Sequence, residues 1–155
     1  LVKKRYPNAR FQLLGAPESS RGGVPLETVK GWEREGIIEY LGVTRDVRPY
    51  VGQANVVVLP SWREGLPCSL MEAMSMGRPI VATDVPGCRD VAVRGKNGFL
   101  VPVRTPEALA KALESFLEDS ALTARMGKEG RFIAETELDA RKAADLILSV
   151  MKLVS

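Results

Sequence analysis

Short apolar runs alternate with longer amphipathic segments along this chain. Each run is brief, rich in Val, Ile or Leu, and bounded by turn-forming residues, which is typical of strands buried on both faces of a parallel sheet. Strands are predicted at residues 11–15, 37–42, 56–59, 79–83 and 99–101. Because helical patterns separate the strands, the sequence predicts an α/β fold: a Rossmann-like, doubly wound parallel sheet with helices on both faces and right-handed crossovers.

Helices are expected between and after these strands, at residues 26–36, 47–54, 67–77 and, briefly, 88–91. From residue 105 onward the pattern is helical throughout, with Thr105 as the expected cap and Pro106 at the first helical position. Residues 143–151 form a strongly apolar helical segment, so we expect this last helix to pack against another element.

The segment that carries the candidate chemistry spans residues 60–79. It runs from the end of a predicted strand through a loop, residues 61–66, into a helix that has Pro67 in its first turn. The start of this helix lies at the edge of the sheet where doubly wound folds bind ligands. Free backbone N–H groups near Cys68, Ser69 and Leu70 favour an anion at that position.

Two carboxylates accompany this helix, Glu64 in the loop and Glu72 eight positions later. A carboxylate beside an anion site is suited to accept hydrogen bonds from hydroxyl groups, and a nucleotide sugar carries both phosphate and hydroxyl groups. A second interpretation remains open, in which Glu64 is a solvated loop residue and Glu72 pairs with a base such as Arg78.

Four motifs of this chain resemble the donor-binding signature of the retaining glycosyltransferases of family 4, which have the GT-B fold. They are Glu64-Gly65-Leu66-Pro67, Leu70-Met71-Glu72-Ala73-Met74, the segment 77–83 and the segment 98–101. The two glutamates match the E-x7-E motif of that family. The resemblance implies one donor-binding domain over residues 1–155, from which the N-terminal acceptor lobe and the first strand of the sheet are absent.

The resemblance also implies a role for each residue of the motif. Glu64, the catalytic residue, would bind hexose hydroxyls and place negative charge near the anomeric carbon, where positive charge grows in the transition state. Glu72 would accept both ribose hydroxyls. The backbone N–H groups of Gly65 and Leu66 would face the hexose, and those of Cys68, Ser69 and Leu70 the pyrophosphate.

The nucleotide base is expected at a second segment, the loop that contains Val43 and Arg45. In the family this loop meets the base largely through its main chain. The alternative interpretation is a solvated turn, with Asp46 near the start of the next helix.

The function implied by the resemblance is transfer of a hexose or N-acetylhexosamine from a nucleoside diphosphate sugar, expected to be UDP-linked. The acceptor would be a glycan or a lipid-linked molecule held by the absent lobe, in bacterial polysaccharide biosynthesis, with retention of anomeric configuration. Without that lobe the chain is expected to be inactive. Two other classes stay open: a GT-B-related epimerase or phosphorylase, and a non-catalytic nucleotide-binding domain.

Charge and composition exclude several other classes of function. The chain has 22 basic and 19 acidic residues, a net charge of +3, and its basic residues are scattered, so we expect no nucleic-acid partner. It contains no histidine, which rules out Ser-His-Asp catalysis and a histidine-based zinc site from this chain. Since there is also no Asp-x-Asp stretch, we expect metal-independent chemistry without a cofactor.

The two cysteines and the lack of a long apolar run indicate a reduced, cytoplasmic setting, without a signal peptide. The full-length protein is expected either free in the cytoplasm or peripherally bound at the inner face of the cytoplasmic membrane. Around the motif, Trp62 is expected to pack rather than stack on a ligand. Pro86-Gly87 and Asp90 stand where the family usually has Gly-Gly and then Glu, and Asp90 is expected to be a helix-start acid.

Overall fold

The computed structural model describes residues 1–17 and 23–154 of the chain. These residues form two compact units, Leu1–Val47 and Arg48–Ser155, each with its own parallel sheet. The expectation of one donor-binding domain over residues 1–155 stays a prediction. Each unit is described by itself below.

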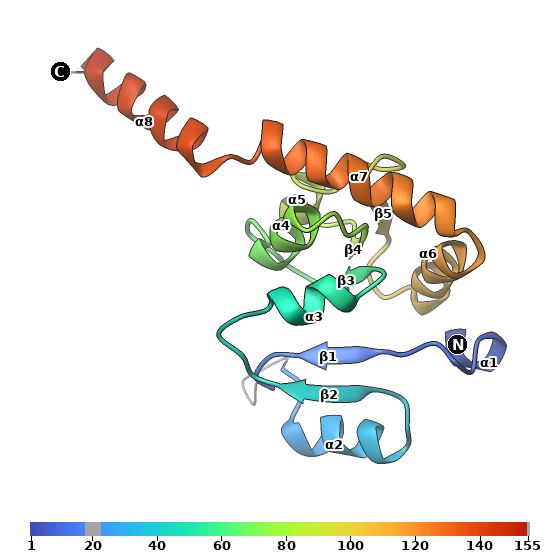
Figure 1. Ribbon diagram of the computed structural model, residues 1–155. Helices are drawn as coiled ribbons and strands as arrows, with labels where there is room; N and C mark the ends of the chain where they lie inside the picture. The colour runs from blue at the N-terminus through green and yellow to red at the C-terminus, as the bar shows by residue number, and fades with distance from the viewer. Residues whose placement is uncertain (18–22, 155) are drawn as a thin grey trace. The chain divides into compact units, whose positions relative to one another are not determined.

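Among its described residues, the first unit has two parallel strands and two helices, which are labelled in Figure 1. Its elements are α1 (Val2–Arg5), β1 (Gln12–Leu14), α2 (Leu26–Arg34) and β2 (Glu39–Gly42). Helix α2 packs on β2 and buries Val29 almost completely. The strand β2 begins at Glu39, so Ile37 and Ile38 of the predicted strand lie before it.

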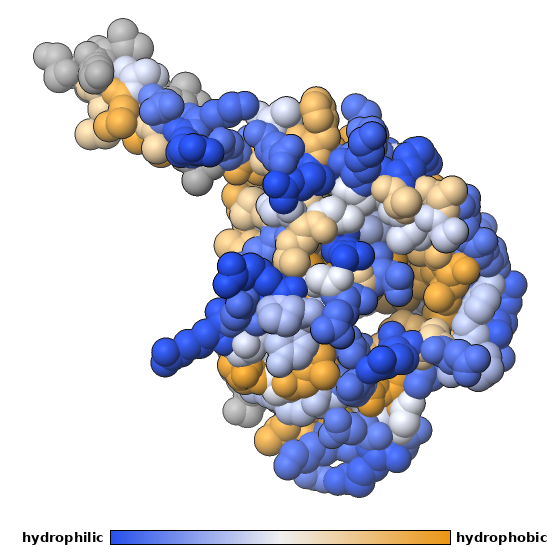
Figure 2. All heavy atoms as spheres, viewed as in Figure 1, coloured by the Kyte–Doolittle hydropathy of each residue, from blue (hydrophilic) through white to orange (hydrophobic). Residues whose placement is uncertain are grey.

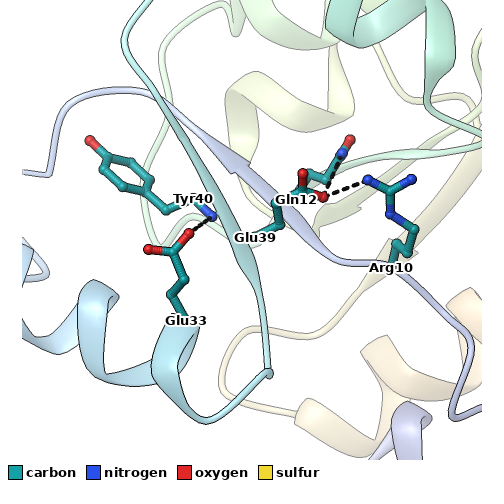
Figure 3. Close-up of polar contacts among 5 residues, drawn as sticks. All are labelled: Arg10, Gln12, Glu33, Glu39 and Tyr40. Atoms are coloured by element: carbon teal, nitrogen blue, oxygen red, sulfur yellow. Dashed lines mark hydrogen bonds and ion pairs between the residues drawn. The ribbon is translucent and has the colours of Figure 1, made fainter.

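Polar side chains fasten the two strands of the first unit at their start (Figure 3). The Glu39 carboxylate accepts hydrogen bonds from Arg10 at 2.7 Å and from Gln12 at 3.0 Å. The bond from Gln12, and then the bond and charge of Arg10, hold the pKa of Glu39 below its ordinary value. On the other side of β2, Glu33 of α2 accepts the backbone N–H of Tyr40 at 3.0 Å, which ties the helix to the strand.

The second unit holds the other three strands, paired in parallel in the order β3-β4-β5. Its elements are α3 (Arg48–Gln53), β3 (Val57–Leu59), α4 (Cys68–Ser75), β4 (Ile80–Thr83), α5 (Pro86–Arg89), β5 (Gly98–Val101), α6 (Pro106–Glu118), α7 (Ser120–Thr136) and α8 (Ala140–Val154). The central strand β4 is buried throughout.

Alternate residues of β4 enter two different hydrophobic clusters. Ile80 and Ala82 pack with the buried faces of α4 and α7, whereas Val81 packs with a cluster that contains Phe116 of α6 and Met126 of α7. The period of two along the strand therefore sends its side chains to opposite faces of the sheet, each covered by helices. The predicted arrangement of helices on both faces is confirmed.

Within each unit the strands pair in parallel, β1 with β2 in the first and β3-β4-β5 in that order in the second, as parallel strands do in a doubly wound fold. The predicted fold class, an α/β fold with Rossmann-like parallel sheets, is confirmed.

One prediction about a helix end is wrong, and another holds in position but not in side-chain bonding. Helix α5 begins at Pro86, two residues before the expected Cys88, so Asp90 is its C-terminal cap and not a helix-start acid. Thr105 is the N-cap residue of α6 and Pro106 its first residue, as predicted, but the Thr105 hydroxyl donates to the Val103 carbonyl at 3.2 Å and accepts no N–H of the helix. Helix α7 has the side-chain cap that α6 lacks, because Asp119 accepts the N–H of Leu122.

The apolar pattern of the last helix, α8, predicts that it packs against another element, but three of its apolar residues are exposed. Ile147, Leu148 and Met151 are each more than half exposed, and apolar atoms show on the surface of α8 in Figure 2. In the part of the chain that the structure describes, no helix combines the length and apolarity needed to cross a membrane.

Candidate functional site

Helix α4 carries the part of the candidate site that contains Cys68, Ser69 and Glu72. Pro67 precedes the helix with an extended backbone (φ −77°, ψ 99°), and Gly77 follows it in the left-handed region (φ 68°), where glycine is favoured. Leu70, Ala73 and Met74 are fully buried, as their helical spacing predicts. This buried face leaves Cys68, Ser69 and Glu72 exposed on the other side of the helix.

Helix α7 lies across α4 and holds it on the sheet (Figure 1). The two helices approach closely because α7 has glycine where they meet. A Cβ atom added at Gly127 would lie 2.2 Å from the carbonyl oxygen of Gly77, far closer than a real contact. The position of α4 is therefore set by a packed core on one face and by α7.

The backbone N–H groups at the start of α4 differ in their hydrogen bonding. The amide of Leu70 donates to the Pro67 carbonyl at 3.1 Å, so it is paired inside the first turn. The amides of Cys68 and Ser69 find no acceptor among the described residues. Two of the three amides proposed for an anion are thus open, and the side chain of Leu70 belongs to the core.

Both candidate carboxylates are available to a ligand. Glu64 is partly buried in the loop after β3, and Glu72 is exposed on α4. Within the described residues, neither carboxylate makes a hydrogen bond or ion pair. The guanidinium group of Arg78 donates to the carbonyl of Gly52 instead, so the Glu72–Arg78 pair of the alternative interpretation does not form.

The segment after β4 fixes the loop that carries Glu64. The hydroxyl of Thr83, at the end of β4, donates to the Ser61 carbonyl. A few residues later, the backbone of α5 passes so close to the loop that a Cβ atom at Gly87 would lie 1.4 Å from the carbonyl oxygen of Gly65. The loop is therefore anchored at its beginning and near its end.

Cys88, next to Gly87, is fully buried below this loop. Burial, and then the negative charge of Glu64, raise the pKa of the Cys88 thiol above its ordinary value. The sequence predicts only a turn at Asp84-Val85-Pro86-Gly87 and gives no signal that Gly87 or Cys88 contacts the site. Only their place beneath Glu64, more than twenty positions earlier in the chain, reveals their contact with the site.

Trp62 is exposed, so the prediction that it packs in the fold is wrong. Its side chain is 69% exposed, and the guanidinium carbon of Arg104 lies 4.6 Å from the centre of its ring. This is a cation–π contact at the surface. Beside the pair lies a cavity of about 180 Å³, lined by residues at the carboxyl ends of β3, β4 and β5, among them Pro60 and Thr83.

The residues proposed for the base, Val43 and Arg45, lie in the loop after β2, in the first unit. Both are exposed, Val43 by 70%. The loop is a turn closed by a side chain, because the N–H of Asp46 donates to the Thr44 hydroxyl at 3.1 Å. The expected turn is present, and it presents Val43 to solvent.

The fold and this site define a class of protein: an α/β lobe that offers amides and carboxylates at the carboxyl ends of parallel strands. Comparison with known proteins is more specific. The family model described as "Glycosyl transferases group 1" matches residues 1–119. The chain belongs to this glycosyltransferase family.

Three similar proteins illustrate the relationship. The putative glycosyltransferase EpsD of Bacillus subtilis is 32% identical over 146 residues, which cover 94% of this chain and 38% of EpsD. The N,N'-diacetylbacillosaminyl-diphospho-undecaprenol alpha-1,3-N-acetylgalactosaminyltransferase of Campylobacter jejuni is 28% identical over 77% of this chain and 31% of its own length. The crystal structure of Anabaena Alr3699/HepE in complex with UDP superposes with a TM-score of 0.85 at 23% identity, over 94% of this chain and 41% of that chain. The chain thus spans 31% to 38% of the curated relatives it matches first.

Proposed function

We propose that this chain forms the donor-binding lobe of a retaining glycosyltransferase of family 4. The enzyme would transfer a hexose or N-acetylhexosamine from a UDP-linked sugar. The observation that carries the proposal is the pair of unpaired carboxylates, Glu64 and Glu72, which flank the open amides of Cys68 and Ser69 at the start of α4.

The nucleotide half of the donor is assigned to α4. A helix N-terminus with unsatisfied N–H groups attracts an anion, so the pyrophosphate binds at the amides of Cys68 and Ser69. One turn further along, Glu72 accepts the ribose hydroxyls, which is possible because no basic side chain in the described residues occupies its carboxylate. The base is assigned to the loop of Val43 and Arg45. HepE, whose structure contains UDP, shares this fold and motivates the choice of uridine.

The sugar half is assigned to the loop before α4. The amides of Gly65 and Leu66 face the hexose, and the carboxylate of Glu64 accepts its hydroxyls. As the bond to the leaving phosphate breaks, positive charge develops at the anomeric carbon and ring oxygen, and the negative charge of Glu64 stabilises it. We propose a metal-independent reaction with retention of configuration.

The acceptor is proposed to bind outside this chain, on the acceptor lobe of a GT-B enzyme. The Campylobacter relative is named for transfer to an undecaprenol-linked sugar, which supports a lipid-linked or glycan acceptor in polysaccharide biosynthesis. Such an acceptor would bring the protein to the inner face of the cytoplasmic membrane as a peripheral protein. Because the acceptor lobe supplies half of the site, we expect no sugar transfer by the 155-residue chain alone.

The test is a titration of the chain with UDP and with GDP in the presence of a metal chelator, followed by amide NMR. We expect saturable shifts over residues 65–72 with UDP, and weaker binding in Glu72→Gln. The matched control is Glu129→Gln, which removes an exposed helical carboxylate of α7 and should bind UDP as the natural chain does. A folded spectrum that responds to neither nucleotide, or equal affinity in Glu72→Gln and the natural chain, would overturn the assignment.

A further inference from the structure

We propose that Gly87 is a positioning residue for the sugar half of the site. Its missing side chain lets the backbone of α5 support the loop at Glu64 and Gly65, and so sets where the Glu64 carboxylate stands. The predicted effect on sugar binding rests on the proposed function, whereas the predicted effect on the position of the loop rests on the geometry of Gly87 alone.

The geometry leaves no room for any side chain at this position. A Cβ atom at Gly87 would lie 1.4 Å from the carbonyl oxygen of Gly65, 2.5 Å from its carbonyl carbon and 2.8 Å from the carbonyl oxygen of Glu64. All three are backbone atoms, so no change of rotamer can relieve the overlap. The backbone of Gly87 is not in the left-handed region, so space, and not conformation, requires glycine here.

The loop, and not α5, would yield to an added methyl group. The residues on both sides of Pro86-Gly87 belong to the core, since Val85 and Cys88 pack in the same cluster as Leu70 and Met74. The loop, in contrast, is exposed at Gly65 and Leu66. Restoring van der Waals contact would take a shift of about 2 Å.

The consequence is specific to the sugar. Glu64 and Gly65 would move, while Glu72 and the amides at the start of α4 keep their own support from the core and α7. A misplacement of about 1 Å of a positioned group can cost on the order of a hundredfold in catalysis. A substitution at Gly87 should therefore separate recognition of the sugar from binding of the nucleotide.

Three glycine variants test this. Gly87→Ala adds the methyl group that should displace the loop at Glu64 and Gly65. Gly127→Ala is a second crowded variant, in α7 where it meets the end of α4, with its Cβ 2.2 Å from the Gly77 carbonyl oxygen. Gly52→Ala is an uncrowded control, with Met76 Cε at 3.5 Å. The dissociation constants of UDP, UDP-glucose and UDP-N-acetylglucosamine are measured by calorimetry for each.

We expect Gly87→Ala to keep its UDP affinity within about threefold, while the ratio of the sugar-nucleotide to the UDP dissociation constant rises about tenfold or more for the sugar that binds best. Gly127→Ala should lose thermal stability without changing this ratio, and Gly52→Ala should change neither. The double variant Glu64→Gln/Gly87→Ala should show little further loss beyond Glu64→Gln, because both act through one carboxylate. An unchanged ratio in Gly87→Ala, or full additivity, would overturn the proposal.

Two further measurements keep the test decisive. Amide shifts at Glu64 and Gly65, recorded without nucleotide, should change in Gly87→Ala and not in Gly52→Ala. Unchanged shifts in Gly87→Ala would refute the steric claim, whether or not the chain binds a nucleotide. Failure of the natural chain to bind any nucleotide would instead refute the proposed function and leave the steric claim standing. If Gly87→Ala fails to fold, Thr83→Val frees the loop at Ser61 without adding volume. Thr83→Val should raise the ratio of the sugar-nucleotide to the UDP dissociation constant, and Thr83→Ser should keep this ratio at the value of the natural chain. An unchanged ratio in a folded Thr83→Val would count against the proposal.

Discussion

Helix α4 and the loop before it, residues 61–66, each carry one glutamate of the candidate site, but different forces hold them in place. The helix has its own buried face, made of Leu70, Ala73 and Met74. The loop has mostly exposed residues, and its position comes from Thr83 and Gly87, which belong to the segment after β4. The nucleotide half of the site is therefore supported by the core, and the sugar half by contacts from one neighbouring segment.

The largest expected effect concerns the support of the helix. Leu70→Ala removes a fully buried side chain and should lower the free energy of unfolding by about 2–5 kcal/mol, as measured by urea denaturation. The matched loop variant, Leu66→Ala, trims a side chain that is more than half exposed and should change it by less than about 0.5 kcal/mol. Similar losses in the two variants would mean that the loop has a core of its own, against the comparison.

Substitutions of the two glutamates should affect the binding of different parts of the donor. Glu72→Gln removes the charge that accepts the ribose hydroxyls, and charge-assisted hydrogen bonds contribute about 1.5–3 kcal/mol, so UDP should bind roughly ten- to a hundredfold more weakly. Glu64→Gln should leave UDP affinity nearly unchanged and weaken only the sugar nucleotides. Calorimetric titrations measure both dissociation constants for each variant. A loss of UDP affinity in Glu64→Gln would show that Glu64 also contributes to nucleotide binding, so that the two halves of the site are not separate.

A smaller effect is expected from the anchor at the start of the loop. Thr83→Val removes the hydroxyl that donates to the Ser61 carbonyl and should cost about 1 kcal/mol of unfolding free energy. Amide hydrogen exchange should quicken in the loop and stay unchanged over α4, whose support is independent. Thr83→Ser keeps the hydroxyl and serves as the control. Faster exchange in α4 as well would show that the helix depends on the loop.

The smallest effect is a dependence on alkaline pH. Because the pKa of Cys88 is raised in the folded chain, unfolding releases the thiol proton above the ordinary thiol pKa of about 8.5, and stability falls as pH rises through that range. The free energy of unfolding should therefore be lower at pH 9 than at pH 8. Urea denaturation at both values, compared with Cys88→Ala, isolates the contribution. The same slope in both proteins would show that Cys88 does not carry it.

The sequence predicts the helix of the site, which the core supports, better than it predicts the loop, which a distant segment supports. The strands, helix α4 and its buried residues were predictable, because apolar spacing is a local pattern that the core enforces. The contact of Gly87 with Gly65 joins residues more than twenty positions apart, and no local pattern encodes such an approach. The pairing of the Leu70 amide with Pro67 and the end of α5 at Asp90 escaped prediction because they depend on the geometry of a single turn.

The most direct test of this account is a crystal structure of the chain with UDP-N-acetylglucosamine bound. The account predicts the pyrophosphate at the amides of Cys68 and Ser69, both ribose hydroxyls within hydrogen-bond distance of the Glu72 carboxylate, and the sugar ring beside Glu64. A nucleotide bound away from the start of α4, or a ribose that does not touch Glu72, would contradict it.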